Sequence, residues 1–277
     1  MINLFRFKVI SDNLKDEFWC SHDIEKTPYD NRTQYSKHFH ENFELLLFLE
    51  GDVSYNIDGN IYNLKPYDLL LIPPYTYHFL IPKSNVCYES YVINIGTDSL
   101  SSKQKEKLFS PPHILNIAND SDLRRMFTLL DYYYEAFSDT DFHQATLHTL
   151  YTVLLMLFYK KDEKEPPDES TEEITLISKI TTYINENITE ELNAEIIATH
   201  FNFSRSYIQN LFSSVMNIGL KQYINRKKIY AARADIQKGM LPNDVMKKYS
   251  FKDYSSFYRL YKTVFEVSPR DDFKLKK

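Results

Sequence analysis

The sequence predicts an α+β protein of more than one domain: an N-terminal β-barrel followed by helices, then an all-α C-terminal domain with two helix-turn-helix units. Three observations predict it. At 277 residues the chain is long enough for two domains with real cores. Strand-like segments fill the first hundred residues, and helical periodicity takes over near residue 121. A polar stretch with two prolines then separates the last hundred residues from the rest.

Four segments in the N-terminal part are rich in aliphatic and aromatic residues, as strands are: 45–51, 53–64, 67–82 and 88–96. Asp58-Gly59 interrupts an alternating pattern, and this dipeptide favours a tight hairpin turn. Several short strands at this spacing predict a barrel or sandwich, which we expect within residues 1–118.

Residues 119–159 are expected to be helical. Leu123, Phe127, Leu130 and Tyr134 fall on one face of a helix that begins near 121, and 142–159 continues as a second, more apolar helix. Residues 160–171, KKDEKEPPDEST, contain two prolines and no aliphatic or aromatic side chain, which predicts an exposed linker. The remaining residues, 172–277, form the predicted helical domain, whose turn-prone points are Asn202, Asn217, Gly239 and Ser250.

Composition excludes several classes of protein. With 5 glycines and neither G-x-G-x-x-G nor G-x-x-x-x-G-K-[ST], a glycine-rich nucleotide site is not expected. The two cysteines, Cys20 and Cys87, indicate reduced thiols rather than a disulfide scaffold. The N-terminus lacks a signal peptide pattern, and the apolar run 149–159 is too short to span a bilayer. We therefore expect a cytoplasmic protein with no membrane partner.

Charge is unevenly distributed along the chain. Residues 200–277 carry 16 Lys and Arg against 6 Asp and Glu, a net charge of +10. Residues 1–199 carry 17 against 32, a net charge of −15. A basic C-terminal part suggests a polyanionic partner, although a solvated charged face would show the same excess.

Residues 194–215 have the pattern of a helix-turn-helix. Ile197 and Ala198 are placed to pack the first helix, Asn202 tolerates the left-handed turn, and Ser204 is a suitable N-cap for the second helix. Four apolar residues of that helix are expected to face inward: Ile208, Leu211, Phe212 and Val215. Four polar residues of the types that contact bases and phosphates face outward: Arg205, Ser206, Gln209 and Asn210.

Residues 243–265 repeat this layout. Asp253 is the expected cap, and three residues pack inward: Phe257, Leu260 and Tyr261. The exposed face carries Tyr254, Ser255, Ser256, Tyr258 and Arg259. Between the units, 220–238 predicts a helix roughly 28 Å long. Such a spacer can hold two recognition helices about one DNA turn apart, roughly 34 Å.

Residues 190–273 resemble the DNA-binding domain of AraC/XylS-type transcription regulators. The matching pieces are IIATHFNFSRSYIQNLF, LKQYINRKKIYAARADI and VMKKYSFKDYSSFYRLYKTVFEVSP, at matching spacing over about eighty residues. The resemblance implies recognition helices at 204–215 and 253–264. It places contacts with double-stranded operator DNA on Arg205, Ser206, Gln209, Asn210, Lys252, Tyr254, Ser255, Ser256 and Arg259. The sequence departs from the family pattern where glycine is common, at Asn202, Asn217, Ser250 and Glu266, and at Met246, where alanine is usual.

Residues 38–51, HFHENFELLLFLEG, resemble the first motif of the cupins, and 67–82 resemble the second. In metal-binding cupins the ligands would be His38, His40, Glu44 and His78, a set that suits Fe, Mn, Zn, Cu or Ni. Regulators of the AraC type commonly carry a cupin-like domain, usually without metal. Tyr67 and Tyr75 stand at two cupin glycine positions, where we expect bulky rings to narrow the barrel mouth.

These patterns favour a regulator over an enzyme. The expected protein is a homodimeric transcription activator with no catalytic residue, no cofactor and no bound metal. Its cupin-like domain would sense a small polar metabolite, a sugar being one candidate, and RNA polymerase is a further candidate partner. The expected effector-binding residues are His38, His40, Glu44, Tyr75 and His78. The alternatives are a metal-dependent cupin enzyme fused to a nucleic-acid-binding domain, and a DNA-binding protein whose cupin is only a dimerisation scaffold.

Overall fold

The computed structural model describes residues 2–9, 18–35, 37–97, 100–111, 113–160 and 172–274. The chain divides into two compact units. The first comprises Met1–Ile57 and Ile61–Glu169, and the second comprises Asp58–Asn60 and Ser170–Lys277. Apart from Lys160, which ends a helix, the expected linker 160–171 lies outside the described residues.

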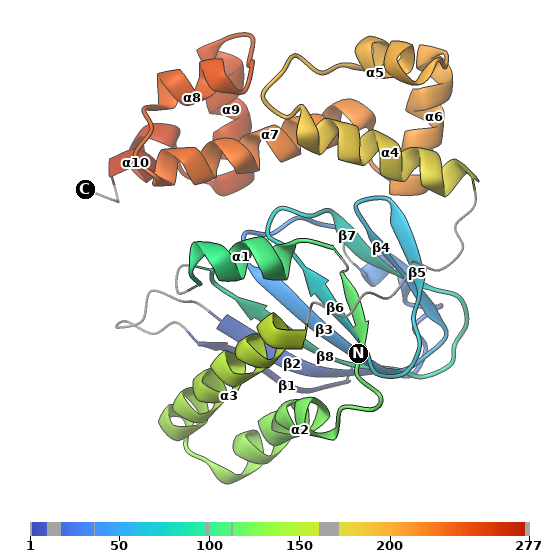
Figure 1. The fold of residues 1–277 in the computed structure, drawn as a ribbon, viewed down its shortest axis with the longest axis vertical. Coiled ribbons are helices and arrows are strands. Elements are labelled where there is room, and N and C mark those ends of the chain that lie inside the picture. The colour runs from blue at the N-terminus through green and yellow to red at the C-terminus, as the bar shows by residue number, and fades with distance from the viewer. Residues whose placement is uncertain are drawn as a thin grey trace. The chain divides into compact units, whose positions relative to one another are not determined.

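The first unit contains two antiparallel sheets (Figure 1). The six-stranded sheet has the order β1-β2-β8-β3-β6-β9 and the three-stranded sheet the order β5-β4-β7. The strands are β1 (Ile2–Val9), β2 (Phe18–Glu25), β3 (Phe43–Glu50), β4 (Val53–Ile57), β5 (Asn60–Asn63), β6 (Asp68–Ile72), β7 (His78–Pro82), β8 (Tyr88–Ile95) and β9 (Ile114–Asn116).

The Asp58-Gly59 turn is confirmed as the link between β4 and β5. Both residues have positive φ, 47° for Asp58 and 89° for Gly59. Two successive left-handed residues match the twist of the flanking strands, which is why this dipeptide favours hairpins.

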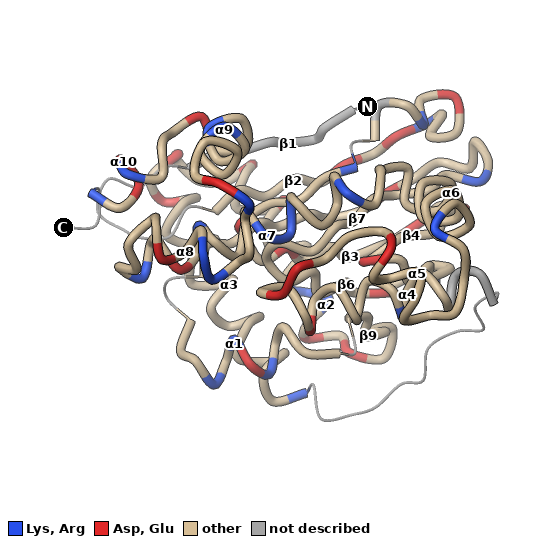
Figure 2. Tube along the Cα trace, turned by 90° about the horizontal axis from the view of Figure 1, so that it is seen from above, with Lys and Arg blue, Asp and Glu red and all other residues tan. Residues whose placement is uncertain are grey.

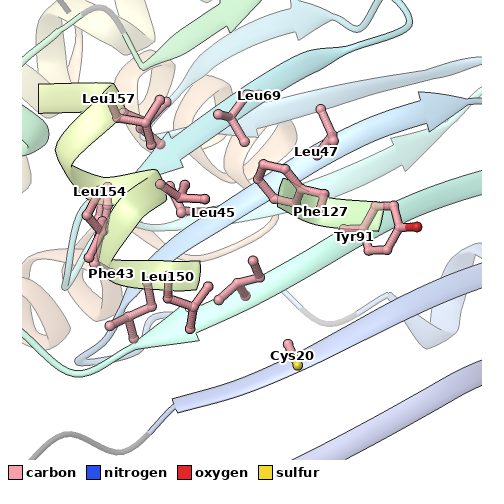
Figure 3. Packing of buried hydrophobic residues seen from close by; sticks show 14 of the residues in the cluster. Cys20, Phe43, Leu45, Leu47, Leu69, Tyr91, Phe127, Leu150, Leu154 and Leu157 are labelled. Carbon is pink, nitrogen blue, oxygen red and sulfur yellow. The ribbon is translucent and has the colours of Figure 1, made fainter. Parts of the chain in front are cut away.

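Two hydrophobic clusters lie on opposite faces of the six-stranded sheet, because successive side chains of a strand alternate in direction. In β3, Leu45 and Leu47 join one cluster with helices, while Leu46 and Phe48 join the interior between the two sheets. Figure 3 shows the helix-side cluster, where Leu150, Leu154 and Leu157 of one helix pack against the strands. Its helices are α1 (Ser102–Phe109), α2 (Ser121–Ala136) and α3 (Asp139–Lys160).

The predicted apolar face of α2 is confirmed at three of its four positions. Leu123, Phe127 and Leu130 are buried, but Tyr134 is 40% exposed. Tyr134 belongs to the last turn of α2, where its ring meets Phe142 edge-on at 6.1 Å instead of entering the cluster.

The second unit is helical. Its elements are α4 (Glu172–Glu186), α5 (Ala194–Phe201), α6 (Arg205–Met216), α7 (Leu220–Gln237), α8 (Pro242–Lys248), α9 (Tyr254–Phe265) and α10 (Pro269–Lys274). The pairs α5–α6 and α8–α9 are the two helix-turn-helix units, joined by α7. With 18 residues, α7 is about 27 Å long. No helix among the described residues is long and apolar enough to cross a bilayer.

The turns of this unit fall where the sequence predicts them. Asn202, Asn217, Gly239 and Ser250 all have positive φ, between 53° and 97°. Glycine adopts this region without steric cost, and asparagine tolerates it better than most residues. The chain therefore turns at each of these four residues.

Lys228 of α7 ties the two helix-turn-helix units together. Its side chain is buried, and Nζ donates to the carbonyl oxygens of Glu190 (2.5 Å) and Tyr249 (2.9 Å). Burial lowers the pKa of Lys228, against the opposing effect of Glu191 and Glu190. Glu190 precedes α5 and Tyr249 follows α8, so one ammonium group satisfies a carbonyl beside each unit.

Candidate functional site

The two predicted recognition helices begin at the predicted caps. The Ser204 hydroxyl accepts a hydrogen bond from the backbone N of Tyr207 (3.2 Å) at the start of α6. The Asp253 carboxylate accepts one from the backbone N of Ser256 (2.7 Å) at the start of α9. Each cap satisfies a backbone donor that the first turn of a helix leaves open.

In α6, the outward residues lie largely as the sequence predicts. Arg205, Ser206 and Asn210 are exposed, and Gln209 is half-buried. On the inner face, Ile208, Leu211 and Phe212 are buried, whereas Val215 is only half-buried. Met216, the next residue and the last of α6, is fully buried.

The predicted contact residues at the second recognition helix are all exposed: Lys252 before the cap of α9, and Tyr254, Ser255, Ser256 and Arg259 within α9. Tyr258 is half-buried, as is Leu260, while Phe257 and Tyr261 are fully buried. The Tyr261 hydroxyl donates to Asp272 Oδ2 (2.6 Å), which also pairs with Arg233 Nε (2.7 Å). This buried network fixes the inner face of α9 against α7 and α10.

Lys and Arg residues are spread along α7, α8 and α9 of the second unit (Figure 2). Phe203 and Tyr207, beside the cap of α6, were not anticipated as surface residues. Their rings stack at 4.9 Å and are 44% and 41% exposed. In the sequence, the only sign of this exposed aromatic pair is that Phe203 and Tyr207 lie on either side of the Ser204 cap.

A second candidate site lies in the barrel. His38, His40, Glu44 and His78 come from separate segments, yet their ligand atoms all lie within 4.8 Å of one another. The backbone brings them together: His38 and His78 exchange backbone hydrogen bonds (3.3 and 3.2 Å), and Glu44 lies on β3. The structure thus unites four of the five predicted effector-binding residues.

Tyr75, the fifth, joins the cluster through its backbone. Its N donates to the carbonyl oxygen of His40 (2.8 Å), and its φ is 63°. Tyr67 also has a left-handed φ, 70°. Both positions thus keep the backbone that makes glycine usual there. The expectation that Tyr67 narrows the barrel mouth is wrong: its ring packs on the helix-side cluster, 4.7 Å from the Arg124 guanidinium.

Glu44 is the centre of the cluster. Its Oε2 lies 3.1 Å from His40 Nε2 and accepts a hydrogen bond from Asn94 Nδ2 (2.9 Å). Its Oε1 accepts one from the Tyr55 hydroxyl (3.4 Å) and lies 3.8 Å from His78 Nε2. Asn94 and Tyr55 were missed from the sequence. Asn94 pairs with Glu44 in the register of β8 and β3, and a polar residue inside the apolar stretch 88–96 was the signal.

Burial shapes the titration of this cluster. Burial alone would raise the pKa of Glu44, but the hydrogen bonds with His40 and Asn94 hold it well below its usual range. Burial lowers the pKa of His78 to about 4, against the opposing effect of Glu44. The carboxylate is therefore ionised and the His78 imidazole neutral near pH 7.

Another buried histidine links the barrel to α2. His22 Nε2 lies 2.8 Å from Glu89 Oε1, and Nδ1 lies 3.1 Å from Asp131 Oδ1. The Tyr91 hydroxyl donates to Asp131, and its ring stacks on His22 at 4.1 Å. Burial opposes ionisation, but the two carboxylates outweigh it and raise the pKa of His22 above 6.5.

The Cys20 and Cys87 thiols are both free, as expected.

Comparison with known protein families also divides the chain into an N-terminal ligand-binding part and a C-terminal helix-turn-helix part. The family described as the AraC-like ligand binding domain matches residues 26–145. A helix-turn-helix domain family matches residues 197–274. A DNA-binding helical unit behind a ligand-binding barrel defines a transcription regulator.

Two relatives and one solved structure are similar to this chain. The HTH-type transcriptional activator AarP of Providencia stuartii is 30% identical over 96 residues, which cover 34% of this chain and 71% of AarP. The HTH-type transcriptional activator RhaS of Klebsiella pneumoniae (strain 342) is 20% identical over 250 residues, covering 87% of this chain and 88% of RhaS. The structure of ToxT from Vibrio cholerae O395 is 12% identical and covers 94% of this chain and 98% of ToxT, with a TM-score of 0.37.

The chain belongs to the AraC family of transcription regulators. It combines the AraC-like ligand-binding domain with a DNA-binding domain of two helix-turn-helix units.

Proposed function

We propose that this protein is an effector-controlled transcription activator that works as a homodimer in the cytoplasm and has no enzymatic activity. Its two recognition helices bind operator DNA, and the barrel binds a small polar molecule. Effector binding shifts the population between arrangements of the paired DNA-binding domains, which requires the effector to bind one arrangement more tightly than another. The names of AarP and RhaS, both activators, support activation.

The observation that carries the DNA-binding proposal is the matched exposure of α6 and α9. Each helix is capped, each buries an apolar inner face, and each presents exposed polar side chains from its first turn. In a helix-turn-helix these are the residues that reach base edges and phosphates. The proposed contacts are Arg205, Ser206, Gln209, Asn210, Lys252, Tyr254, Ser255, Ser256 and Arg259.

The proposed effector site is the cluster of His38, His40, Glu44, Tyr75 and His78. Burying a polar group costs free energy unless the group finds a hydrogen-bond partner. A polar cluster next to the apolar interior between the sheets therefore suggests a site where a small polar ligand forms hydrogen bonds with these side chains. The chemistry of the cluster suits a small molecule with several oxygen atoms, a class that includes sugars and hydroxy acids.

A stripe on α3 supports the proposed dimer. Tyr151, Leu155 and Tyr159 recur every four residues, which places them along one side of the helix. They are 38%, 49% and 75% exposed. Aligned exposed apolar side chains mark interaction surfaces, and a helix from a second copy would cover them. Contact with RNA polymerase is part of the same proposal for an activator.

The experiment combines operator binding with response. Full-length protein is titrated onto DNA from upstream of its own gene, with and without candidate metabolites. A His40→Ala variant should bind the operator as tightly as wild type but lose the metabolite response, whereas Lys103→Ala, exposed on α1, should keep both. Loss of operator binding in His40→Ala alone, with the fold intact, would contradict a purely sensory role for the cluster.

A further inference from the structure

We propose that His22, Glu89 and Asp131 form a proton-dependent latch that holds α2 against the six-stranded sheet and makes dimerisation of this protein respond to pH. The three residues lie on three elements: His22 on β2, Glu89 on β8 and Asp131 on α2. None of them belongs to the proposed effector site or to the recognition helices. The latch itself follows from the geometry of the first unit, whereas its effect on dimerisation rests on the proposed homodimer.

Both ring nitrogens of His22 face a carboxylate. Nδ1 lies 3.1 Å from Asp131 Oδ1, and Nε2 lies 2.8 Å from Glu89 Oε1. A carboxylate accepts hydrogen bonds, and a neutral imidazole donates only one. The imidazolium is therefore the form of the ring that donates to both partners. Because imidazole is a stronger base than a carboxylate, the proton belongs to the ring.

Loss of this proton breaks one of the two contacts. A neutral ring keeps a hydrogen on one nitrogen and turns a lone pair toward the other carboxylate. The Glu89 contact is the shorter one, so we expect the ring to keep it and to turn the lone pair toward Asp131. The His22 side chain is only 8% exposed, so water screens this repulsion poorly. Among the described residues of the sheet, the Tyr91 hydroxyl then remains as the donor to Asp131, and α2 is held less tightly.

The other described groups around His22 are neutral. The Tyr91 ring stacks on the imidazole at 4.1 Å and lies beside Phe127 of α2 (Figure 3). Burial raises the pKa of the Tyr91 hydroxyl, and it raises the pKa of the Cys20 thiol, on the same strand as His22, to about 12. On β1 the residue paired with His22 is Phe5, which has no ionisable group. The charge of the latch is therefore set by the imidazole and its two carboxylates.

The latch is closed, with both carboxylates hydrogen-bonded to the ring, on the acid side of its titration. Burial lowers the pKa of His22, but the hydrogen bonds and charges of Asp131 and Glu89 outweigh burial and raise this pKa above 6.5. The latch is therefore fully closed below about pH 6.5 and opens as pH rises through the folded pKa.

Helix α2 connects the latch to the proposed dimer surface. The hydroxyl groups of Tyr133 on α2 and Thr149 on α3 are hydrogen-bonded at 3.2 Å, and both helices contribute to the helix-side cluster. The exposed stripe of Tyr151, Leu155 and Tyr159 lies on α3. Because α3 packs against α2, release of α2 weakens the support of this stripe, and we expect the dimer to weaken with it.

Two variants hold the latch in opposite states at every pH. In Glu89→Gln the side-chain amide can donate to Nε2, so a neutral His22 donates to Asp131 and accepts from the amide without an extra proton. In His22→Gln no imidazolium forms, and one amide replaces a ring that met two carboxylates. Helix α2 should be held at all pH values in the first variant and released in the second.

Hydrogen exchange of α2, followed by mass spectrometry on the full-length protein, reports the state of the latch. The three proteins are compared at each pH between about 6 and 9, so that the intrinsic exchange rate cancels. Wild type should match Glu89→Gln at the acid end and exchange about 3- to 10-fold faster than this variant at the alkaline end, the effect of one lost hydrogen bond. Peptides from α6, in the second unit, should exchange alike in all three proteins.

Sedimentation equilibrium on the same samples gives the dissociation constant of the dimer. We expect this constant to rise with pH in wild type by a factor similar to that of the exchange rate. It should stay low in Glu89→Gln and high in His22→Gln. The matched control is His200→Gln, which replaces an exposed histidine of the second unit and should show the pH dependence of wild type.

The outcomes separate the latch from the proposed dimer. Exchange of α2 in wild type that follows Glu89→Gln over the whole pH range would overturn the latch and leave the dimer intact. A protein that is monomeric at every pH would contradict the dimer, and with it the pH-dependent dimerisation, while α2 exchange still decides the latch. Exchange that depends on pH beside a constant dissociation constant would overturn the link to dimerisation. If His22→Gln loses the wild-type circular dichroism spectrum, the comparison of wild type with Glu89→Gln decides.

Discussion

Asn202 and Ser250 occupy equivalent turns in the two helix-turn-helix units. Their φ values are 60° and 53°. In each turn the following residue donates a backbone hydrogen bond five residues back, from Phe203 to Ala198 (2.9 Å) and from Phe251 to Met246. This pattern closes the end of a helix through one left-handed residue. The equivalence explains why both positions are usually glycine in the family.

Substitutions at Ser250 measure the steric free-energy cost of the left-handed backbone in this turn. Its hydroxyl donates to the carbonyl oxygen of Thr189 (2.7 Å), and both Ser250→Ala and Ser250→Gly remove this bond. Only glycine also removes the steric cost of a positive φ, which is about 1 kcal/mol or more for other residues. We expect the glycine variant to be more stable than the alanine variant by about 1 kcal/mol in urea unfolding. Equal midpoints for the two would contradict a strained backbone at this residue.

His22 should make stability depend on pH. Glu89 and Asp131 raise its pKa above 6.5 in the folded protein, so the folded state holds the proton more tightly than the unfolded chain. The resulting stabilisation is fully present below about pH 6.5 and is lost as pH rises through the folded pKa. Chemical unfolding at several pH values should show a free-energy gap between wild type and His22→Gln that shrinks toward alkaline pH. The exposed His148→Gln is the control, and a gap independent of pH would refute the linkage.

Lys228 should be structural rather than a DNA contact. Replacing it with Met leaves the carbonyl oxygens of Glu190 and Tyr249 without their donor, which should lower the free energy of unfolding by about 1–3 kcal/mol. Lys221→Met removes an exposed lysine from the same helix and should change stability little. A Lys228→Met protein as stable as Lys221→Met would mean that these two hydrogen bonds contribute nothing.

Arg205 and Arg259 should carry specific DNA contacts, one in each recognition helix. Arg205→Ala and Arg259→Ala should each weaken operator binding by about 1–3 kcal/mol, the usual range for an arginine that pairs with a base. Arg270 is exposed on α10, outside both recognition helices, and Arg270→Ala serves as the control. Fluorescence anisotropy at fixed salt measures all three, and unchanged affinity in the first two variants would remove these contacts from the proposal.

Much of this fold could be predicted from local patterns, because turns and amphipathic faces are set within a few residues. The hairpin at Asp58-Gly59 and the caps Ser204 and Asp253 are examples. Strand β2 was missed, since Ser21, His22 and Asp23 interrupt its apolar pattern. Ser21 and His22 are nevertheless buried, and His22 is satisfied by Asp131, more than a hundred residues away, which no local pattern reveals.

In the candidate site, too, some features follow from local sequence motifs and others only from contacts between distant residues. The resemblance to the cupin motifs predicted that His38, His40, Glu44 and His78 would meet, but the partners of Glu44 depend on strand pairing. Asn94 reaches it across the β3–β8 register and Tyr55 from the other sheet. The contact of His78 Nδ1 with the Thr76 carbonyl oxygen and the full burial of the ring also depend on tertiary structure.

The central claim is that this protein binds specific DNA. The most direct measurement is a gel shift of the full-length protein with DNA from upstream of its own gene, at physiological salt and with excess unrelated competitor, because phosphate contacts alone give salt-sensitive, non-specific binding. We predict retardation that survives the competitor and is weakened when Arg205 and Arg259 are replaced together. Retardation abolished by the competitor, or equal in wild type and the double variant, would contradict sequence-specific recognition by α6 and α9.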